Sequence, residues 1–173
     1  PDRISPRADF HDYSCGDYFV TVCTDNMEHF FGEINDDKMQ LSVIGRYCQK
    51  QLLELTEHYK YVEIPLFVVM PNHVHAILRV IDLHDTVGPP VMRTALSVII
   101  GGFKRAVTMY ARRNNIPFKW QSRYHDHIIR GAIDGNNIAN YIETNVFVGV
   151  QIVSTRQSDP NKTMATPSAI FQV

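Results

Sequence analysis

The pattern of hydrophobic and polar positions predicts four strands and three helices. Segments rich in apolar, β-branched and aromatic residues are typical of strands, and they occur at 17–24, 61–69, 73–80 and 124–130. Helices are predicted at 41–59 and 94–114, where apolar residues recur with a 3.6-residue period, and at 138–146. The predicted order is β-α-β-β-α-β followed by one more helix.

That order is the split βαβ, or ferredoxin-like, arrangement. It places the first and third strands at the centre of a four-stranded antiparallel sheet, with the two long helices on one face. We therefore expect an α+β fold whose other sheet face is free for a site, a partner chain or nucleic acid. The extra C-terminal helix carries Tyr141.

The remaining segments are expected to connect these elements. Gly101 and Gly102 fall inside the second long helix and mark a kink, a close approach to a backbone or phosphate, or a tolerated weak spot. Asp134 or Asn136 is a candidate cap for the last helix. The expected connecting segments are an arm at 1–16, a polar loop with room for a short hairpin at 25–38, and connections at 81–92 and 131–137. One domain at 1–150 would then be followed by a tail at 151–173.

Composition limits the class of protein. A chain of 173 residues with 45% hydrophobic and 20% charged residues is typical of one globular domain. No apolar run approaches the roughly 20 residues that span a membrane, and residues 1–7 lack the apolar core of a signal peptide. The three cysteines have no metal-ligand spacing. We therefore expect a protein of the reducing cytoplasm with no membrane partner.

Charge is distributed unevenly, although the net charge is only −1. Residues 25–63 contain eight acidic and four basic side chains, whereas residues 104–130 contain seven basic side chains and one acidic side chain. A local excess of positive charge attracts phosphates, so the second segment is a candidate DNA-binding region; a solvated helix face is the alternative. The candidate contacts are Lys104, Arg105, Arg112, Arg113, Lys119, Gln121 and Arg123, with His125 and His127 as further candidates for DNA contact or proton transfer.

The strand at 73–80 begins with His73-Val74-His75. Side chains alternate between the faces of a strand, so the two histidines share one face with Cα atoms about 6.5–7 Å apart. Two imidazoles at this spacing can bind one divalent metal ion if a third ligand comes from elsewhere. The alternative is a pair of ordinary histidines, but the apolar flanks predict a buried strand on which polar rings need partners.

The last predicted helix places Tyr141 and Asn145 on one face, because they are four residues apart. The amide oxygen of Asn145 could supply the third metal ligand, with Tyr141 one turn away. A tyrosine on a short helix is more often part of the core. Its pairing with the His-Val-His motif is what favours a functional role.

Five stretches of the chain resemble the single-tyrosine HUH transposases, which include the REP-associated tyrosine transposases of bacterial chromosomes. They occur in family order and span roughly residues 17–150. The stretches are Tyr18-Phe19-Val20-Thr21, Val69-Met70-Pro71-Asn72-His73-Val74-His75, Ile99-Ile100-Gly101-Gly102-Phe103-Lys104, Trp120-Gln121-Ser122-Arg123-Tyr124-His125-Asp126-His127-Ile128-Ile129-Arg130 and Tyr141-Ile142-Glu143-Thr144-Asn145.

The resemblance implies that His73, His75 and Asn145 bind Mg²⁺ or Mn²⁺ and that Tyr141 is the nucleophile. The implied activity is that of a DNA transposase, or strand transferase, acting on single-stranded or hairpin DNA. Attack by the tyrosine would leave a 5′-phosphotyrosine and a free 3′-hydroxyl, and reversal would rejoin a strand. The resemblance also implies a homodimer on the bacterial nucleoid, in which the last helix could serve the His-Val-His motif of its own chain or that of its partner. The family usually has Asn-Pro where this chain has Asn145-Val146, a difference that concerns the end of the helix.

Two other functions are compatible with these residues. A ferredoxin-like sheet is also the design of RNA-recognition modules, so a decayed or host-adopted transposase could bind nucleic acid without cleaving it. The two histidines stand where such modules have stacking aromatics, which argues against this reading. A replication initiator or relaxase would use the same HUH chemistry, but those proteins usually have longer chains.

Overall fold

The computed structural model of the chain describes residues 15–81, 95–146 and 150–152. The predicted arm, the connection at 81–92 and the tail therefore lie largely outside the described residues. The elements are β1 (Gly16–Cys23), the 3-10 helix η1 (Asp25–Met27), β2 (Gly32–Asn35), β3 (Lys38–Leu41), α1 (Val43–His58), β4 (Val62–Met70), β5 (His73–Val80), α2 (Ala95–Arg113), β6 (His125–Ile128), α3 (Gly131–Val146) and β7 (Val150–Ile152).

The main sheet has the strand order β6-β1-β5-β4-β7, and neighbouring strands are antiparallel. The first and third predicted strands, β1 and β5, therefore occupy the centre of a four-stranded ferredoxin-like sheet, as the α+β prediction requires. β7 adds a fifth strand at the β4 edge and extends into the segment predicted as a tail. The expected short hairpin is formed by β2 and β3, which make a separate two-stranded sheet.

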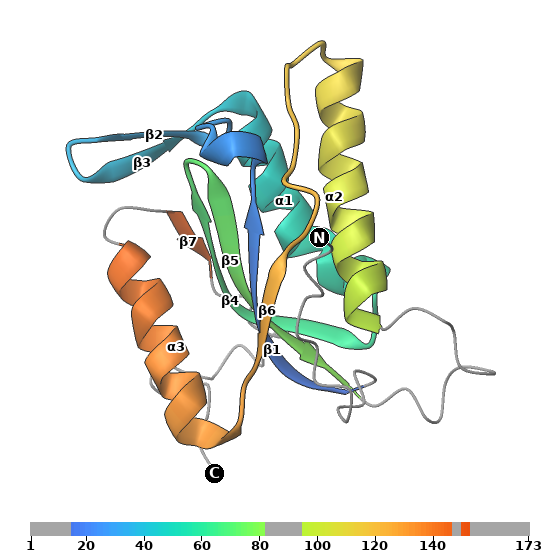
Figure 1. The fold of residues 1–173 in the computed structure, drawn as a ribbon, viewed down its shortest axis with the longest axis vertical. Coiled ribbons are helices and arrows are strands. Elements are labelled where there is room, and N and C mark those ends of the chain that lie inside the picture. The colour runs from blue at the N-terminus through green and yellow to red at the C-terminus, as the bar shows by residue number, and fades with distance from the viewer. Residues whose placement is uncertain (1–14, 82–94, 147–149, 153–173) are drawn as a thin grey trace, which may run out of the picture.

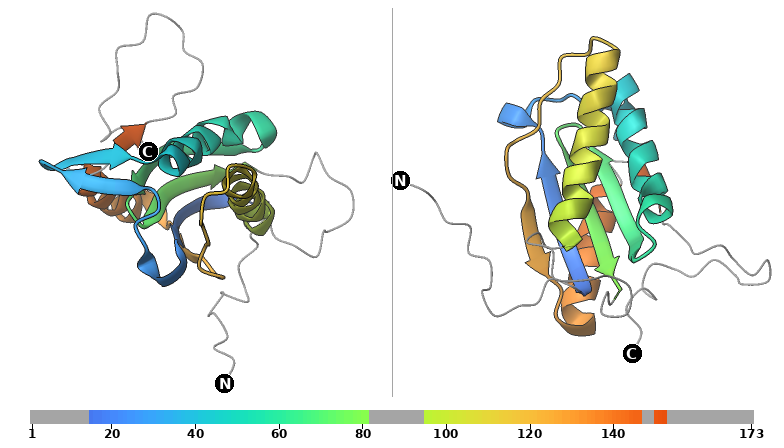
Figure 2. Two further views of the ribbon diagram at one scale, coloured as in Figure 1. Left: turned by 90° about the horizontal axis from the view of Figure 1, so that it is seen from above. Right: turned by 90° about the vertical axis from the view of Figure 1, so that its right-hand side faces the viewer.

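Helices α1 and α2 pack side by side against one face of the sheet (Figures 1 and 2). The apolar residues Tyr18, Val20 and Val22 alternate along β1 and point into this main core, where they meet buried residues of both helices. Ser42 begins α1 by accepting a hydrogen bond from the Gly45 N–H at 3.0 Å. This half of the fold agrees with the predicted layers.

The opposite face of the sheet is covered by α3, which corrects the expectation of a free face (Figure 1). Ala139 and Ile142 of α3 are buried against Leu66, Val68 and Ile77 of β4 and β5 in a second, smaller core. The C-terminal helix is therefore a third layer of the fold. Whatever site this face carries must lie beside α3.

The predicted connection at 131–137 is wrong, because α3 begins at Gly131. Glycine and asparagine are weak helix formers, and Gly131, Gly135 and Asn136 concealed this first part of the helix. Packing overrides propensity here, since Gly135 is buried one turn before Ala139. Asp134, a predicted cap, instead lies in the first turn and accepts a hydrogen bond from the Arg130 N–H at 2.9 Å, which lowers the pKa of its carboxyl group.

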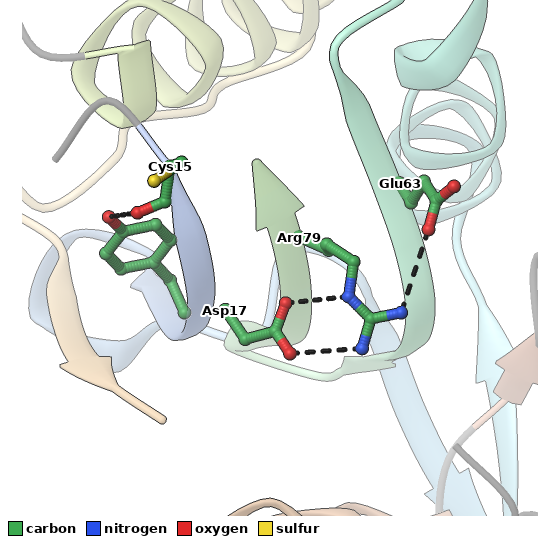
Figure 3. Close-up of polar contacts among 5 residues, drawn as sticks. Cys15, Asp17, Glu63 and Arg79 are labelled. Carbon is green, nitrogen blue, oxygen red and sulfur yellow. Dashed lines mark hydrogen bonds and ion pairs between the residues drawn. The ribbon is translucent and has the colours of Figure 1, made fainter. Parts of the chain in front are cut away.

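An ion-pair cluster joins three neighbouring strands at one end of the sheet (Figure 3). The Arg79 guanidinium of β5 donates two hydrogen bonds to the Asp17 carboxylate of β1, at 2.8 and 3.0 Å, and lies 3.7 Å from Glu63 of β4. Such a bidentate pair is stronger than a simple surface ion pair. Arg79 lies at the opposite end of β5 from His73, so the cluster fixes the strand register at a distance from the candidate site.

Two helical glycines differ in their surroundings. A Cβ on Gly45 of α1 would collide with the carbonyl group of Phe31, whereas a Cβ on Gly101 of α2 would meet no atom within 4 Å. A Cβ on the neighbouring Gly102 would meet the Tyr59 hydroxyl group. The close approach at Gly102 is therefore to a side chain and not to the predicted backbone or phosphate, whereas Gly101 fits the alternative of a tolerated weak spot.

We predict opposite effects of the same substitution at these two sites. Gly101→Ala should raise the free energy of unfolding by about 0.5–1 kcal/mol, because alanine favours a helix where space is open. Gly45→Ala should lower it, because the methyl group displaces the Phe31 backbone. Urea unfolding of both variants checks this, and stabilisation by Gly45→Ala would contradict the close contact.

Candidate functional site

His73 and His75 of β5 point to the sheet face that α3 covers, and their side chains converge. Their Nε2 atoms lie 3.0 Å apart, and their ring centroids are 4.5 Å apart. The predicted pairing on one face is therefore present in the fold. Imidazole nitrogens at this separation can both contact a single cation.

The other nitrogen of each ring contacts a side chain. His73 Nδ1 lies 2.7 Å from Asn72 Oδ1, and His75 Nδ1 lies 2.9 Å from the Thr21 hydroxyl oxygen. Thr21 of β1 is the register partner of His75. Metal-binding histidines in proteins usually have such a partner on the second nitrogen, because it fixes the ring.

Burial favours the neutral form of both rings by lowering the pKa of each imidazole. His75 is only 6% exposed. Burial lowers its pKa to about 4, with a further contribution from the charge of His73. Burial also lowers the pKa of His73. Neutral imidazole is the form that binds a metal, so this pair fits a divalent cation without an acidic neighbour.

Tyr141 of α3 lies against His75, the buried member of this pair, within the same chain. Its ring centroid is 5.5 Å from that of His75 and 6.2 Å from that of Phe19, and Phe19 is itself 5.1 Å from His75. Tyr141 is nevertheless 52% exposed. The fold therefore brings the predicted nucleophile and the two predicted ligands together, with the tyrosine open to solvent on one side.

Asn145, the predicted third ligand, belongs to the last turn of α3. Its side chain lies outside the described residues, so its role stays a prediction. Within the part of the chain that the structure describes, no group of three or more His, Cys, Asp or Glu side chains is arranged to hold a metal ion. The two histidines are the core of any such site.

Several predicted DNA contacts already have protein partners. The Lys104 ammonium group donates hydrogen bonds to the carbonyl oxygens of Gln121 and Ser122, at 2.7 and 3.3 Å, and it lies 6.0 Å from the Trp120 ring centroid. Lys104 therefore attaches the segment before β6 to α2. Lys119 pairs with Asp25 at 2.9 Å, but its side chain is still 74% exposed.

The remaining candidate contacts are exposed but lie on two different parts of the molecule. Arg105, Arg112 and Arg113 belong to α2, which packs on the sheet face opposite to Tyr141. Gln121 lies nearer to the histidines, since its N–H donates to the Cys23 carbonyl group at 2.9 Å, and Cys23 is the register partner of His73. The exposed Arg123 lies two residues beyond Gln121.

Three residues of the site were not assigned roles from the sequence. Phe19 and Thr21 share a face of β1, and Asn72 precedes His73 in the turn between β4 and β5. The two-residue period could have placed Phe19 and Thr21 on one face. Their contact with His75 depends on the β1–β5 register, which the pattern alone does not give.

None of the helices in the described part of the chain combines the length and apolar content needed to cross a membrane.

We predict that His75 makes the metal-free protein less stable as the pH falls from about 6.5 toward 4. In this range the unfolded chain binds a proton at His75 that the folded chain does not bind. The free energy of unfolding should therefore fall, by up to about 3 kcal/mol. His75→Gln should make the free energy of unfolding depend less steeply on pH, because it removes the titrating group. Phe19→Leu alters the ring contact with His75 but removes no titrating group, so it should leave this pH dependence unchanged. Urea unfolding between pH 4.5 and 7.5 tests this prediction. If the free energy of unfolding changed equally with pH in the unmodified protein and in His75→Gln, the prediction would be refuted.

A solved structure with a similar fold comes from a transposase. A REP-associated tyrosine transposase bound to a REP hairpin superposes with a TM-score of 0.57 and 18% identity, over 83% of this chain and 73% of that chain. A putative transposase from Deinococcus radiodurans has a TM-score of 0.47 and 14% identity, over 82% of this chain and 96% of that chain. The first likeness shows that the fold is transposase-like.

Comparison of sequences gives a closer relationship. No family model matches the chain. An uncharacterized protein of Haemophilus influenzae is 34% identical over 163 residues, which cover 86% of this chain and 91% of the relative. The chain therefore belongs to the same protein family as this Haemophilus influenzae protein.

Proposed function

We propose that the chain is a DNA strand transferase that cleaves and rejoins single-stranded or hairpin DNA through Tyr141. The observation that supports this most is the contact of the Tyr141 ring with His75, whose Nε2 atom meets that of His73. A half-exposed tyrosine beside a half-buried and a buried imidazole combines a nucleophile with a pair of rings that could bind a cation. The transposase-like fold adds support from the structure as a whole.

In the proposed reaction the Tyr141 hydroxyl oxygen attacks a DNA phosphorus atom. The new bond joins this oxygen to phosphorus, the bond from phosphorus to the 3′ oxygen breaks, and the phenol proton is released while the 3′ oxygen takes up a proton. The products are a 5′-phosphotyrosine and a free 3′-hydroxyl group. Because the ester bond is conserved, attack by another 3′-hydroxyl group can rejoin a strand.

The proposed cofactor is Mg²⁺ or Mn²⁺, held by His73, His75 and Asn145. When bound, such an ion would withdraw charge from the phosphate. The chain's own residues contribute the rest. The contact with Phe19 and His75 would hold the tyrosine ring in position for the attack.

The described side chains of the proposed site, which are His73, His75 and Tyr141, come together within one chain. Tyr141 contacts His75 of the same chain, so no second copy is needed to bring these two residues together. A homodimer on the bacterial nucleoid stays part of the proposal through the resemblance described above. Such a dimer would then contain two sites.

We predict that Tyr141→Phe abolishes cleavage and covalent attachment but preserves folding and DNA binding. The substitution removes only the nucleophilic oxygen and keeps the ring against His75. Labelled hairpin and single-stranded oligonucleotides with Mn²⁺ should give a covalent adduct, which peptide mass spectrometry should place on Tyr141. EDTA should prevent its formation.

Tyr110→Phe is the matched control. Tyr110 of α2 stacks on Tyr47 at 3.8 Å between ring centroids, in the layer on the other side of the sheet. Loss of its hydroxyl group should leave cleavage intact. An adduct on another residue, or full cleavage by Tyr141→Phe, would remove Tyr141 from its role. Binding without any cleavage by the unmodified protein would favour a nucleic-acid-binding module.

We predict that the basic end of α2 and the segment after it contact DNA phosphates. Replacement of Arg112, Arg113 and Lys119 together by Ala should reduce the salt dependence of DNA binding by roughly two to three units of slope. The same charge change at Arg46, Lys50 and Lys60, outside this segment, should have little effect. Fluorescence anisotropy over a range of salt concentrations gives both slopes, and equal slopes would show that the basic cluster is only a solvated face.

A further inference from the structure

Residues 119–122, in the connection between α2 and β6, are fixed to the end of β1. Trp120 forms an antiparallel bridge with Thr24. The Gln121 N–H donates a hydrogen bond to the Cys23 carbonyl oxygen at 2.9 Å. The Trp120 ring is buried in the main core. The segment therefore runs along β1 beyond the point where β6 ends its pairing.

Lys104 of α2 attaches the same segment from the other side. Its ammonium group donates to the carbonyl oxygens of Gln121 and Ser122, at 2.7 and 3.3 Å. The Lys104 carbonyl oxygen in turn accepts a hydrogen bond from the Trp120 indole N–H at 3.1 Å. The Lys104 side chain is only partly exposed. The hydrogen bonds of this ammonium group thus go to the backbone of the segment, which leaves it poorly placed for a phosphate.

Gln121 combines a fixed backbone with an exposed side chain. Its N–H bonds to Cys23 and its carbonyl oxygen bonds to Lys104, so the chain is held on both sides of the residue. The residue itself is exposed. Neighbouring residues of an extended segment point to opposite sides, and Trp120 points into the main core. We therefore expect the Gln121 amide on the side away from that core.

The register places Gln121 in the same row of the sheet as His73. Cys23 is the register partner of His73, and it accepts the Gln121 hydrogen bond from its other side. Adjacent strands are about 4.8 Å apart, so the backbones of Gln121 and His73 are separated by roughly 10 Å. That is the length of about three nucleotides in a duplex. DNA bound at the proposed site could therefore also reach Gln121.

We propose that Gln121 contacts a DNA base near the cleavage position and that Lys104 is the positioning residue that presents it. This inference rests on the proposed function, because its ligand is the DNA bound at Tyr141. An amide group offers a donor and an acceptor side by side, which match the edge of a base, as in the contact of glutamine with adenine. Contacts to phosphates carry no sequence information directly. Gln121 supplies sequence preference, and exposed cations such as Lys119 supply affinity.

Lys104 acts through geometry and not through its charge at a phosphate. A side chain that neutralises one phosphate adds about one unit to the slope of binding against salt concentration. Lys104 adds little to this slope, because its ammonium group holds the protein backbone. Lys119, whose side chain is 74% exposed, has the opposite character. The two lysines are therefore distinguishable in one set of measurements.

The test measures binding to a pool of hairpin oligonucleotides with randomised loops and flanks. It uses the Tyr141→Phe protein, so that cleavage does not interfere, and sequencing of the bound fraction should show a base preference. Gln121→Ala should reduce the preference at one position by roughly 5–100-fold. Lys104→Met should reduce the preference at that same position. The two substitutions together should cause no further loss, because they act on one contact.

The salt dependence of binding separates the two lysines. Lys119→Met should lower the slope by about one unit, whereas Lys104→Met should leave the slope unchanged to within about half a unit. Lys50→Met is the matched control. Lys50 lies on α1, where its ammonium group is 3.6 Å from the Glu54 carboxylate, and its replacement should change neither the base preference nor the slope.

The outcomes separate this inference from the proposed function. No base preference at all, or an unchanged preference in Gln121→Ala, would overturn the role of Gln121 even if Lys104→Met did not fold. A slope lowered as much by Lys104→Met as by Lys119→Met would make Lys104 a phosphate contact and overturn its positioning role. Cleavage through Tyr141 would stand in these cases. A protein that bound no oligonucleotide of the pool would remove the proposed function together with this inference.

Discussion

The imidazole rings of His73 and His75 lie on a central strand and need hydrogen-bond partners. This requirement ties β5 to the neighbouring strand β1 and to the turn between β4 and β5. A buried polar group without a hydrogen bond costs about 1–3 kcal/mol. His75, which is 6% exposed, avoids this cost through Thr21 on the neighbouring strand, and His73 does so through Asn72 in the turn. A shift of the β1–β5 register by one residue would turn Thr21 to the other face of the sheet and break the arrangement.

Helix α3 serves both the packing and the candidate site because its residues divide between two environments. Ala139 and Ile142 face the sheet and close the second core. Tyr141 precedes Ile142 by one position, which rotates it about 100° around the helix axis to the border of the apolar face. Its ring packs on Phe19 and His75 while one side stays in solvent. The packing that holds the helix thereby also holds the tyrosine.

Strong local patterns could be predicted from the sequence, and features that depend on packing could not. β5 has the predicted bounds, His73–Val80, because a buried strand bounded by a Pro-Asn turn is a clear signal. The first part of α3 was missed because Gly131 and Gly135 disfavour a helix in isolation. The contact between Thr21 and His75 joins residues 54 positions apart, so it depends on the register of two strands. The charge pattern indicates a basic segment. It cannot show that the Lys104 ammonium group already donates a hydrogen bond to the Gln121 carbonyl group within that segment.

The position of the basic residues places a constraint on how the proposed DNA would bind. Arg112 and Arg113 end a helix on one face of the sheet, whereas Tyr141 lies on the other, so one DNA strand could reach both only by passing around the border of the sheet. Residues 119–121 lie at the end where β5 begins, because the Gln121 N–H bonds to Cys23 opposite His73. The ion pair of Lys119 with Asp25 holds this segment in place while its ammonium group stays exposed. This segment therefore connects the basic end of α2 with the end of the sheet that carries the histidine pair.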